Sequence, residues 1–388
     1  MDMIRRDVER YLKKLASGYA VISITGPRQS GKTTLARMVF DDRPYVSLEN
    51  PDVLEAAESD TRSFLKRYEN GAVFDEAQRC PRLFSFMQEI IDRGEKKCRY
   101  VLTGSQQFGL MSKITQSLAG RVANCTLLPF SYAEWYREKK PPRLETVLFR
   151  GQYPPVLDRS LDPSTWHANY VRNYIERDVR QLASIQDLRT FHLFLRMCAS
   201  RTGQLLNLSG LASDCGIAVN TAKSWISILE ASYIIFLLQP YFDNFGKRLV
   251  KTPKLYFYDT GLCTYLLGLD NEDSLSINTA RGQLFESFAV GEMKKAIFNS
   301  GAIDTLYFWR NKSGLEIDAV LEKNATLTAI EIKSGRTVSP DYFSAILSWK
   351  RVAGKTCKDT FLVYGGDEPG TREGCTVVPW RNTADILS

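Results

Sequence analysis

The sequence lacks every feature of a membrane or secreted protein. Its longest apolar run, Tyr233 to Leu238, is far too short to cross a bilayer, and residues 1–7 are charged with no apolar core of a secretory signal. The eight cysteines occur singly, with no C-x-x-C pair, which argues against structural zinc and for free thiols in a reducing compartment. Tandem repeats and low-complexity segments are also absent. We therefore expect a cytoplasmic protein that has no membrane partner.

The composition is that of an ordinary globular protein, with 44% hydrophobic and 24% charged residues. A length of 388 residues allows two to four domains, each with its own core. The net charge of +7 permits a polyanionic partner without requiring one.

The most informative segment is a β-branched run, Ala20–Thr25, that leads directly into a G-x-x-x-x-G-K-T loop. Backbone N–H groups of such a loop, together with the helix that follows, surround a phosphate chain. We expect Lys32 to bind the β- and γ-phosphates of ATP and the Thr33 hydroxyl to hold Mg²⁺. The predicted nucleotide-binding residues are Gly26, Pro27, Arg28, Gln29, Ser30, Gly31, Lys32, Thr33 and Thr34.

Short β-type runs alternate with helical stretches, which predicts an α/β domain over residues 1–135 with a five-stranded parallel sheet. The runs are Ala20–Thr25, Pro44–Leu48, Ala72–Asp75, Arg99–Thr103 and Asn124–Leu128. Asp75 ends the third run, where it is expected to organise Mg²⁺, and Glu76 is expected to polarise the attacking water. Such a tandem acidic pair is typical of P-loop ATPases with an additional strand between the P-loop strand and the Asp strand.

Three further side chains are predicted to take part in hydrolysis. Ser105 or Gln106, after the fourth run, is expected to orient water or to sense the γ-phosphate, although a plain β-turn explains them as well. Arg121 precedes the fifth run and is the main candidate for an arginine offered to a neighbouring subunit, ahead of Arg79 and Arg82.

Residues 136–195 read as a helical lid or linker, and residues 196–256 read as a winged helix-turn-helix. Gly216 makes the turn and Asn220 is expected to cap the second helix. A basic hairpin follows and resembles a wing that tracks phosphates. The predicted DNA contacts are Thr221, Lys223, Lys247, Arg248, Lys251 and Lys254. The alternative is a winged helix used for packing or for protein contacts, because the second helix has one lysine and no arginine.

A second set of acidic residues lies in the last predicted domain, residues 257–388. Glu286 falls on an amphipathic helix, Asp318 on one strand, and Glu331 and Lys333 on one face of the next strand. This arrangement is similar to the α/β core of PD-(D/E)xK nucleases, in which Asp318 and Glu331 would hold a divalent metal. Lys333 would orient or deprotonate water, and Glu286 would tune the metal site. A solvated Glu/Lys hairpin, or a nuclease-like fold that only docks DNA or protein, remains an alternative.

Taken together, these segments resemble the bacterial and archaeal AAA-type ATPases that carry a C-terminal domain of unknown function. The segments that carry the resemblance are Gly26–Thr34, Phe74–Gln78, Thr103–Gln106, Leu118–Arg121, Leu128–Ser131, Tyr258–Leu262, Glu316–Asp318 and Glu331–Lys333. The resemblance covers nearly the whole chain and implies a winged helix followed by a PD-(D/E)xK-like domain. It also implies a homo-oligomer, commonly a ring, with shared active sites.

Two functions remain open at this point. In the first, ATP hydrolysis drives DNA remodelling or translocation, and the C-terminal domain binds or cleaves the DNA. In the second, the chain is a nucleotide-dependent switch whose C-terminal modules bind protein partners without nuclease activity.

Overall fold

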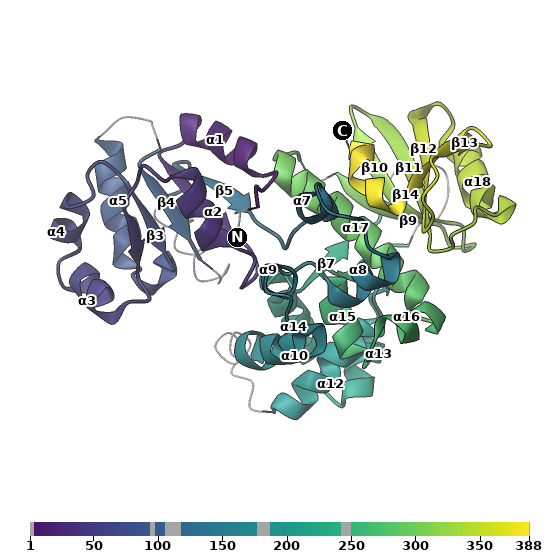
Figure 1. The fold of residues 1–388 in the computed structure, drawn as a ribbon, viewed down its shortest axis with the longest axis horizontal. Helices are drawn as coiled ribbons and strands as arrows, with labels where there is room; N and C mark the ends of the chain where they lie inside the picture. The colour runs from purple at the N-terminus through teal and green to yellow at the C-terminus, as the bar shows by residue number, and fades with distance from the viewer. Residues whose placement is uncertain are drawn as a thin grey trace. The chain divides into compact units, whose positions relative to one another are not determined.

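The computed structural model describes residues 4–93, 98–104, 118–176, 187–241, 250–303 and 305–387. The chain divides into two compact units, both visible in Figure 1. Unit 1 consists of Met1–Phe130, Ala231–Tyr233 and Phe298–Ala302. Unit 2 consists of Ser131–Glu230, Ile234–Ile297 and Ile303–Ser388.

Unit 1 is an α/β domain built on five parallel strands. Its elements are α1 (Glu9–Gly18), β1 (Val21–Thr25), α2 (Lys32–Val39), β2 (Tyr45–Ser47), α3 (Pro51–Ser59), α4 (Thr61–Lys66), β3 (Ala72–Asp75), η1 (Ala77–Arg79), α5 (Arg82–Asp92), β4 (Tyr100–Thr103) and β5 (Val122–Thr126). The strand order is β2-β3-β4-β1-β5, and all four neighbouring pairs are parallel. The predicted sheet is confirmed, and β4 is the additional strand between β1 and the Asp75 strand β3.

The sheet of unit 1 is buried on both faces because its strands are apolar at successive positions. On β1, Val21 packs into a core cluster with side chains of α3, α4 and α5. Ile22 and Ile24 pack into a second cluster with side chains of α1 and α2. The helices therefore form a layer on each side of the sheet, as the alternation of strands and helices predicts.

Unit 2 begins with a series of helices, in agreement with the helical prediction for this part of the chain. They are α7 (Tyr132–Tyr136), α8 (Leu144–Arg150), α9 (Pro154–Asp158), α10 (Pro163–Tyr170), the π-helix η2 (Val171–Ile175) and α12 (Leu188–Ala199). Helices α8 and α10 pack against α15 (Thr260–Leu266), and α8 also packs against α16 (Glu272–Ile277). Whether these helices also act as a lid stays a prediction.

A small antiparallel sheet with a helix pair follows α12. It comprises β6 (Gln204–Leu205), α13 (Leu208–Cys215), α14 (Val219–Ala231), β7 (Ile235–Leu238) and β8 (Lys254–Phe257), with the strand order β6-β8-β7. Gly216 ends α13 in the left-handed conformation with φ 65°, as the turn between the two helices requires. Helix α14 begins at Val219, one residue before the predicted cap.

The last part of unit 2 is a mixed six-stranded sheet with the order β13-β14-β12-β11-β10-β9. It is formed by β9 (Leu306–Arg310), β10 (Glu316–Lys323), β11 (Thr326–Lys333), β12 (Cys357–Tyr364), β13 (Gly370–Arg372) and β14 (Cys375–Pro379). The remaining elements are α17 (Arg281–Ser300), η3 (Pro340–Phe343), α18 (Ser344–Ala353), η4 (Gly354–Thr356) and η5 (Trp380–Leu387). Strands β9, β10 and β11 are antiparallel neighbours, whereas β12 is parallel to β11.

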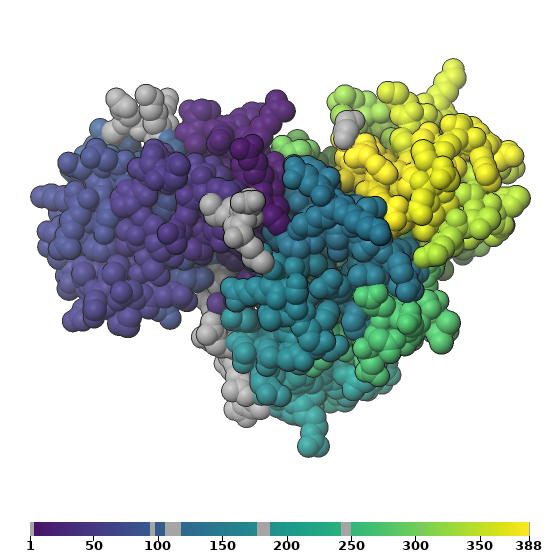
Figure 2. Space-filling model, in the orientation of Figure 1, coloured from purple at the N-terminus to yellow at the C-terminus, as the bar shows by residue number. Residues whose placement is uncertain are grey.

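Helix α18 covers one face of this sheet, where Trp349 meets Trp309 of β9 at 4.7 Å between ring centroids. In the space-filling view, the surface of these C-terminal elements is a closely packed body coloured yellow-green to yellow (Figure 2).

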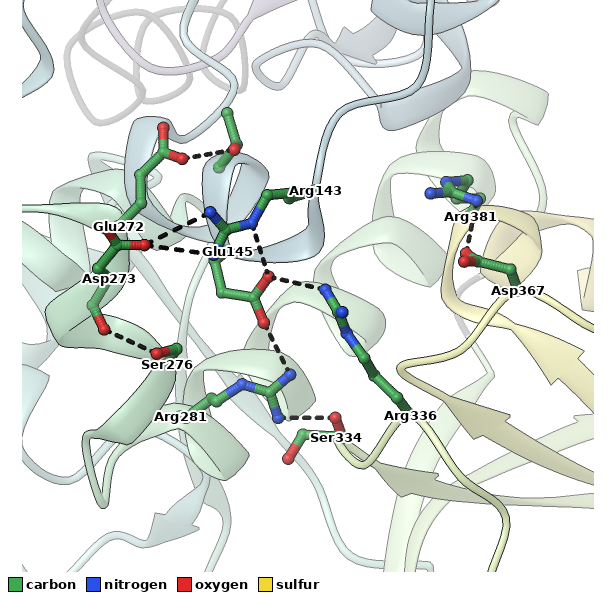
Figure 3. A network of polar contacts seen from close by, with 11 residues as sticks. Arg143, Glu145, Glu272, Asp273, Ser276, Arg281, Ser334, Arg336, Asp367 and Arg381 are labelled. Atoms are coloured by element: carbon green, nitrogen blue, oxygen red, sulfur yellow. Dashed lines mark hydrogen bonds and ion pairs between the residues drawn. The ribbon is translucent and has the colours of Figure 1, made fainter.

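A buried carboxylate connects the helical part of unit 2 to the end of β11 (Figure 3). Glu145 of α8 pairs with Arg281 at 3.0 Å and with Arg336 at 3.4 Å. Arg281 also donates to the Ser334 carbonyl at 2.7 Å.

The segment Tyr258–Leu262, which contributes to the family resemblance, has a structural role here. The buried Asp259 carboxylate accepts backbone N–H bonds from Gln152 at 2.7 Å and from Leu262 at 2.9 Å. It thus caps α15 and holds the chain that leaves α8. A side chain at Gly261 would lie 2.5 Å from the Arg150 carbonyl, so the close contact between α8 and α15 requires glycine.

Two predictions made from absences can be compared with the structure. All eight cysteines are free, and seven of them are buried. Among the helices of the described residues, none is both long and apolar enough to cross a membrane.

Replacing Asp259 by alanine should destabilise unit 2 by about 3 kcal/mol, because two buried backbone donors lose their acceptor. Urea unfolding followed by far-UV circular dichroism measures the change. Asp162 is the matched control, since it caps α10 through Thr165 at 2.8 Å on an exposed surface. Asp162→Ala should cost only about 1 kcal/mol. Equal losses in the two variants would contradict the role given to Asp259.

Candidate functional site

The loop between β1 and α2 has the geometry of a phosphate-binding loop. Gly31 is the N-cap of α2 in the left-handed conformation, with φ 92°, so the chain turns sharply into the helix. The Lys32 ammonium donates to the carbonyls of Gly26 at 3.1 Å and Pro27 at 2.8 Å. The lysine therefore lies along the loop, where Lys32 and Thr33 can bind the phosphates and the metal of a nucleotide.

Asp75, at the carboxyl end of β3, is the centre of a group of hydroxyls. Thr33 donates to it at 3.0 Å and Tyr45 at 2.6 Å, and Thr103 of β4 donates to its other oxygen. Burial, followed by the hydrogen bond to Asp75, raises the pKa of Tyr45 above its ordinary value. Asp75 and Thr33 are thus adjacent, which is the arrangement that an Mg²⁺ ion shared between them requires.

Glu76 follows Asp75 in a strained backbone conformation. Its φ of 53° and ψ of 44° place a glutamate in the left-handed region, which bulky residues seldom adopt. The Glu76 carboxylate accepts a hydrogen bond from Gln78. The role of Glu76 in polarising the attacking water stays a prediction.

Arg6 is hydrogen-bonded to the phosphate-binding loop, and the sequence analysis did not identify it. Its guanidinium donates to the carbonyl of Ser30 at 3.0 Å and to that of Leu128 at 2.8 Å, and it lies 4.6 Å from the ring centroid of Phe130. Arg6 is only 6% exposed. One buried cation therefore connects the loop to the segment that follows β5.

Of the remaining predicted ATPase residues Ser105, Gln106 and Arg121, the structure describes only Arg121. Ser105 and Gln106 lie outside the described residues. Arg121 pairs with Asp92, with Nε 2.5 Å from Oδ1 and Nη2 2.9 Å from Oδ2. An arginine finger at Arg121 would have to break this ion pair, and the assignment stays a prediction.

The predicted acidic set of the C-terminal domain is brought together in unit 2. Asp318 accepts the backbone N–H of Ile332 at 2.8 Å, and Lys333 Nζ lies 2.5 Å from Glu331 and 3.8 Å from Asp318. The second carboxylate oxygen of Glu331 is buried and has no hydrogen-bond partner among the described residues. Strands β10 and β11 pair as the predicted hairpin.

We call Glu286, Glu316, Asp318 and Glu331 the acidic cluster. Two of its carboxylates contact Lys254, a residue that was predicted to contact DNA. Lys254 of β8 is 2% exposed and bonds Glu286 at 2.8 Å; it also forms an ion pair with Glu316. The Tyr256 hydroxyl donates to the same Glu286 oxygen at 2.5 Å. Lys254 therefore faces the acidic cluster and not the solvent, so the described structure does not offer it to a phosphate.

The carboxylates of the acidic cluster strongly perturb one another. Burial, followed by repulsion from Asp318, raises the pKa of Glu286 to about 7 and that of Glu331 to about 8. Burial lowers the pKa of Lys333, but Asp318 and Glu331 outweigh it, and the net shift is upward.

The residues fit a divalent cation only in part. Asp318, the unpartnered oxygen of Glu331 and the Ile332 carbonyl are hard oxygen ligands of the kind that Mg²⁺ and Mn²⁺ take. Within the described ranges, however, three or more Asp, Glu, His or Cys side chains do not converge on one metal position. Glu286 is held by Lys254 and Tyr256 instead.

Three of the other predicted DNA contacts lie among the described residues. Lys223 and Lys251 are exposed, and Thr221 is half-buried on α14. Lys247 and Arg248 lie outside the described residues.

The residues that sequence reasoning missed gave weak signals. Thr103 is the last residue of β4, and Tyr45 is the first residue of β2. Both strands are short, and only the strand order shows that both lie beside β3. Nothing in the pattern around Arg6 links it to a loop 24 residues later.

Models of protein families match most of the chain in succession. Residues 18–136 match an AAA domain, residues 141–273 match a domain of unknown function (DUF8612), and residues 281–383 match a second domain of unknown function (DUF4143). Among curated proteins, the chain is similar to the uncharacterized proteins Rv2008c of Mycobacterium tuberculosis and Mb2031c of Mycobacterium bovis. Each is 31% identical over 339 residues, which cover 87% of this chain and 75% of the relative.

Two solved structures show distant similarity to the chain. The Walker-type ATPase PABY2304 of Pyrococcus abyssi is 17% identical and matches 68% of this chain and 96% of its own, with a TM-score of 0.47. A single-substitution variant of RuvB of Thermotoga maritima is 14% identical and matches 59% of this chain and 85% of its own, with a TM-score of 0.29. These scores are too low to establish a shared fold over the matched length.

The acidic cluster should make the stability of unit 2 depend on pH in the absence of divalent ions. Carboxyls with raised pKa values keep their protons in the folded chain to about pH 7 and 8, whereas unfolded glutamates lose them near 4.5. The folded state then binds more protons, so its stability falls as the pH rises from 5 to 8, by about 1.4 kcal/mol per carboxyl and pH unit at most.

Urea unfolding in EDTA at pH 5.5, 7 and 8.5 measures this dependence. Glu331→Gln should flatten the profile and stabilise the protein at pH 8.5. Glu322→Gln, a half-buried position on the same hairpin, should leave the profile unchanged. A profile that does not differ between the wild type and Glu331→Gln would contradict the raised pKa.

Proposed function

The chain belongs to the same family as the two mycobacterial relatives, and we propose that it hydrolyses ATP and uses unit 2 to engage DNA. The observation that carries the ATPase part is the 3.0 Å contact between Thr33 and Asp75 next to Lys32. Those three groups are the ones a P-loop enzyme uses on a nucleotide with its metal. The match of residues 18–136 to an AAA domain supports the same activity.

In this proposal, Lys32 binds the β- and γ-phosphates, and Thr33 and Asp75 hold the metal between them. Bound Mg²⁺ neutralises phosphate charge and orients the chain of phosphates. Thr103 and Tyr45 fix the orientation of the Asp75 carboxylate by their hydroxyl donors. Glu76 accepts a proton from the attacking water, and Ser105 or Gln106 orients that water. Arg121 of a neighbouring copy is proposed to complete the site in a homo-oligomer.

Lys32→Ala should lower ATP turnover by about 100-fold or more, because the developing phosphate charge loses its lysine. Glu76→Gln should bind ATP without hydrolysing it. A coupled phosphate-release assay and nucleotide retention on the purified protein measure the two effects. Lys13→Ala, an exposed lysine on α1, is the control and should not change turnover. Normal hydrolysis by Glu76→Gln would remove Glu76 from the mechanism.

The DNA part of the proposal rests on α13, α14 and the sheet β6-β8-β7, which together have the element order of a winged helix. Lys223 and Ser224 are exposed on α14, and Lys251 is exposed just before β8. We propose that α14 and the basic segment before β8 bind the phosphate backbone, with little reading of base sequence. Lys254 is excluded from this set by its burial.

The six-stranded sheet supports the nuclease-like part of the proposal. Its antiparallel strands β9 to β11, the parallel strand β12 and the helices α17 and α18 occur in the order of a PD-(D/E)xK core. Asp318 and Glu331 would hold a divalent ion, and Lys333 would orient the water that attacks a phosphodiester. This domain is proposed to bind DNA, and metal-dependent cutting is the activity that its residues would support.

A second candidate function is a nucleotide-dependent switch that binds a protein partner. One observation favours it: α14 carries a single lysine, and its first residue, Val219, is 46% exposed. An apolar contact at that position suits a protein surface better than a phosphate backbone.

DNA binding should weaken steeply as salt rises if the first function holds, because phosphate contacts release counterions. Fluorescence anisotropy with labelled duplex, single-stranded and branched DNA, at several salt concentrations, measures the slope. Lys223→Ala and Lys251→Ala should each lower that slope by about one. Lys355→Ala, an exposed lysine after α18, should leave it unchanged. Binding of none of these DNAs, with no stimulation of ATP turnover, would favour the protein-binding switch.

A further inference from the structure

Lys254 occupies an unusual position for a lysine. It lies on β8, in the small three-stranded sheet, yet its ammonium enters the acidic cluster formed by α17 and β10. The side chain is 2% exposed, and its Nζ lies 5.6 Å from the ring centroid of Phe308. A lysine this deeply buried must be neutralised by carboxylates, and two of them contact it.

The carboxylates that Lys254 contacts are thereby removed from the set that could bind a metal. Glu286 receives Lys254 Nζ and the Tyr256 hydroxyl on the same oxygen. Glu316 contacts Lys254 with one oxygen, while its other oxygen accepts from Arg310 at 3.0 Å. Both side chains are therefore held by fixed cations or donors of the protein.

Glu331 differs from this pair in one respect. Glu331 is 4% exposed, and its second oxygen has no hydrogen-bond partner in the described part of the chain. A buried carboxylate oxygen without a donor is destabilising unless a ligand takes it. Its neighbour Lys333 contacts only the other oxygen.

We propose that Lys254 is a built-in cation in place of a second metal ion, so that the acidic cluster takes one divalent cation. The ion is held by Asp318, Glu331 and the Ile332 carbonyl, while Glu286 binds Lys254 and is no metal ligand. This inference rests on the proposed nuclease-like role and specifies its metal requirement. The preferred ions are Mg²⁺ and Mn²⁺, because all three ligands are oxygens.

Counting Mn²⁺ ions by electron paramagnetic resonance, on the full chain without nucleotide, tests the inference. The ions that belong to the acidic cluster are those lost in Asp318→Asn. Asp318→Asn should bind one ion fewer than the wild type. Glu286→Gln should keep that ion, with an affinity within about threefold of the wild type, since removing a true ligand costs about tenfold or more. Lys254→Met should gain a second ion, because Glu286 and Glu316 lose their ammonium.

The control for removing any buried lysine is Lys295→Met. Lys295 is also 2% exposed, but it pairs with Glu292 at 2.9 Å and with Gln152. This variant should bind one ion like the wild type. If Lys254→Met does not fold, Glu286→Gln decides the question alone, because it leaves Lys254 paired with Glu316.

Three results would overturn the inference: two ions or none in the wild type, loss of the ion in Glu286→Gln, or an unchanged count in a folded Lys254→Met. Failure of the nuclease-like role gives a different pattern. In that case the ion count follows the expectation, while the chain binds none of the DNA structures in the anisotropy assay and cuts none of them when Mg²⁺ or Mn²⁺ is added.

Discussion

Unit 2 depends on one electrostatic constraint, which is that a carboxyl group taken out of water needs a positive partner or must keep its proton. Lys254 meets this need for Glu286 and Glu316, and Lys333 meets it for Glu331. Since Lys254 comes from β8, the same ion pairs connect the small antiparallel sheet to α17 and β10. The same ion pairs therefore balance the charge of the acidic cluster and hold β8, α17 and β10 together.

Much of the fold followed from local pattern. The five parallel strands of unit 1 were predictable because short apolar runs alternate with helical stretches, and β-branched runs buried on both faces have few other uses. The β10–β11 hairpin was predictable because its polar residues alternate. Boundaries were less certain: the amphipathic helix predicted around Glu286 extends as α17 to Ser300, because its later turns are also buried.

The sites were predictable only where the chemistry is carried by neighbours in sequence. Gly31, Lys32 and Thr33 are adjacent, so one motif describes them, and Asp75 was located by its position at a strand end. Tyr45 and Arg6 reach their partners through the tertiary fold. Lys254 was predicted to contact DNA because a basic run surrounds it, and the run does not show that its side chain turns inward. A one-dimensional pattern records charge, whereas burial and partner are decided by packing.

Lys32 has a consequence for how the loop discriminates between nucleotides. Its ammonium already has two carbonyl partners, Gly26 and Pro27, within the loop itself. A phosphate group that takes up this lysine therefore replaces existing hydrogen bonds, and the net gain is the difference between a charged acceptor and two neutral ones. A terminal phosphate whose only contact is Lys32 therefore gains little binding free energy from this exchange. In the proposed ATPase, selectivity for a triphosphate would therefore depend also on the metal that Thr33 and Asp75 would hold, and not on Lys32 alone.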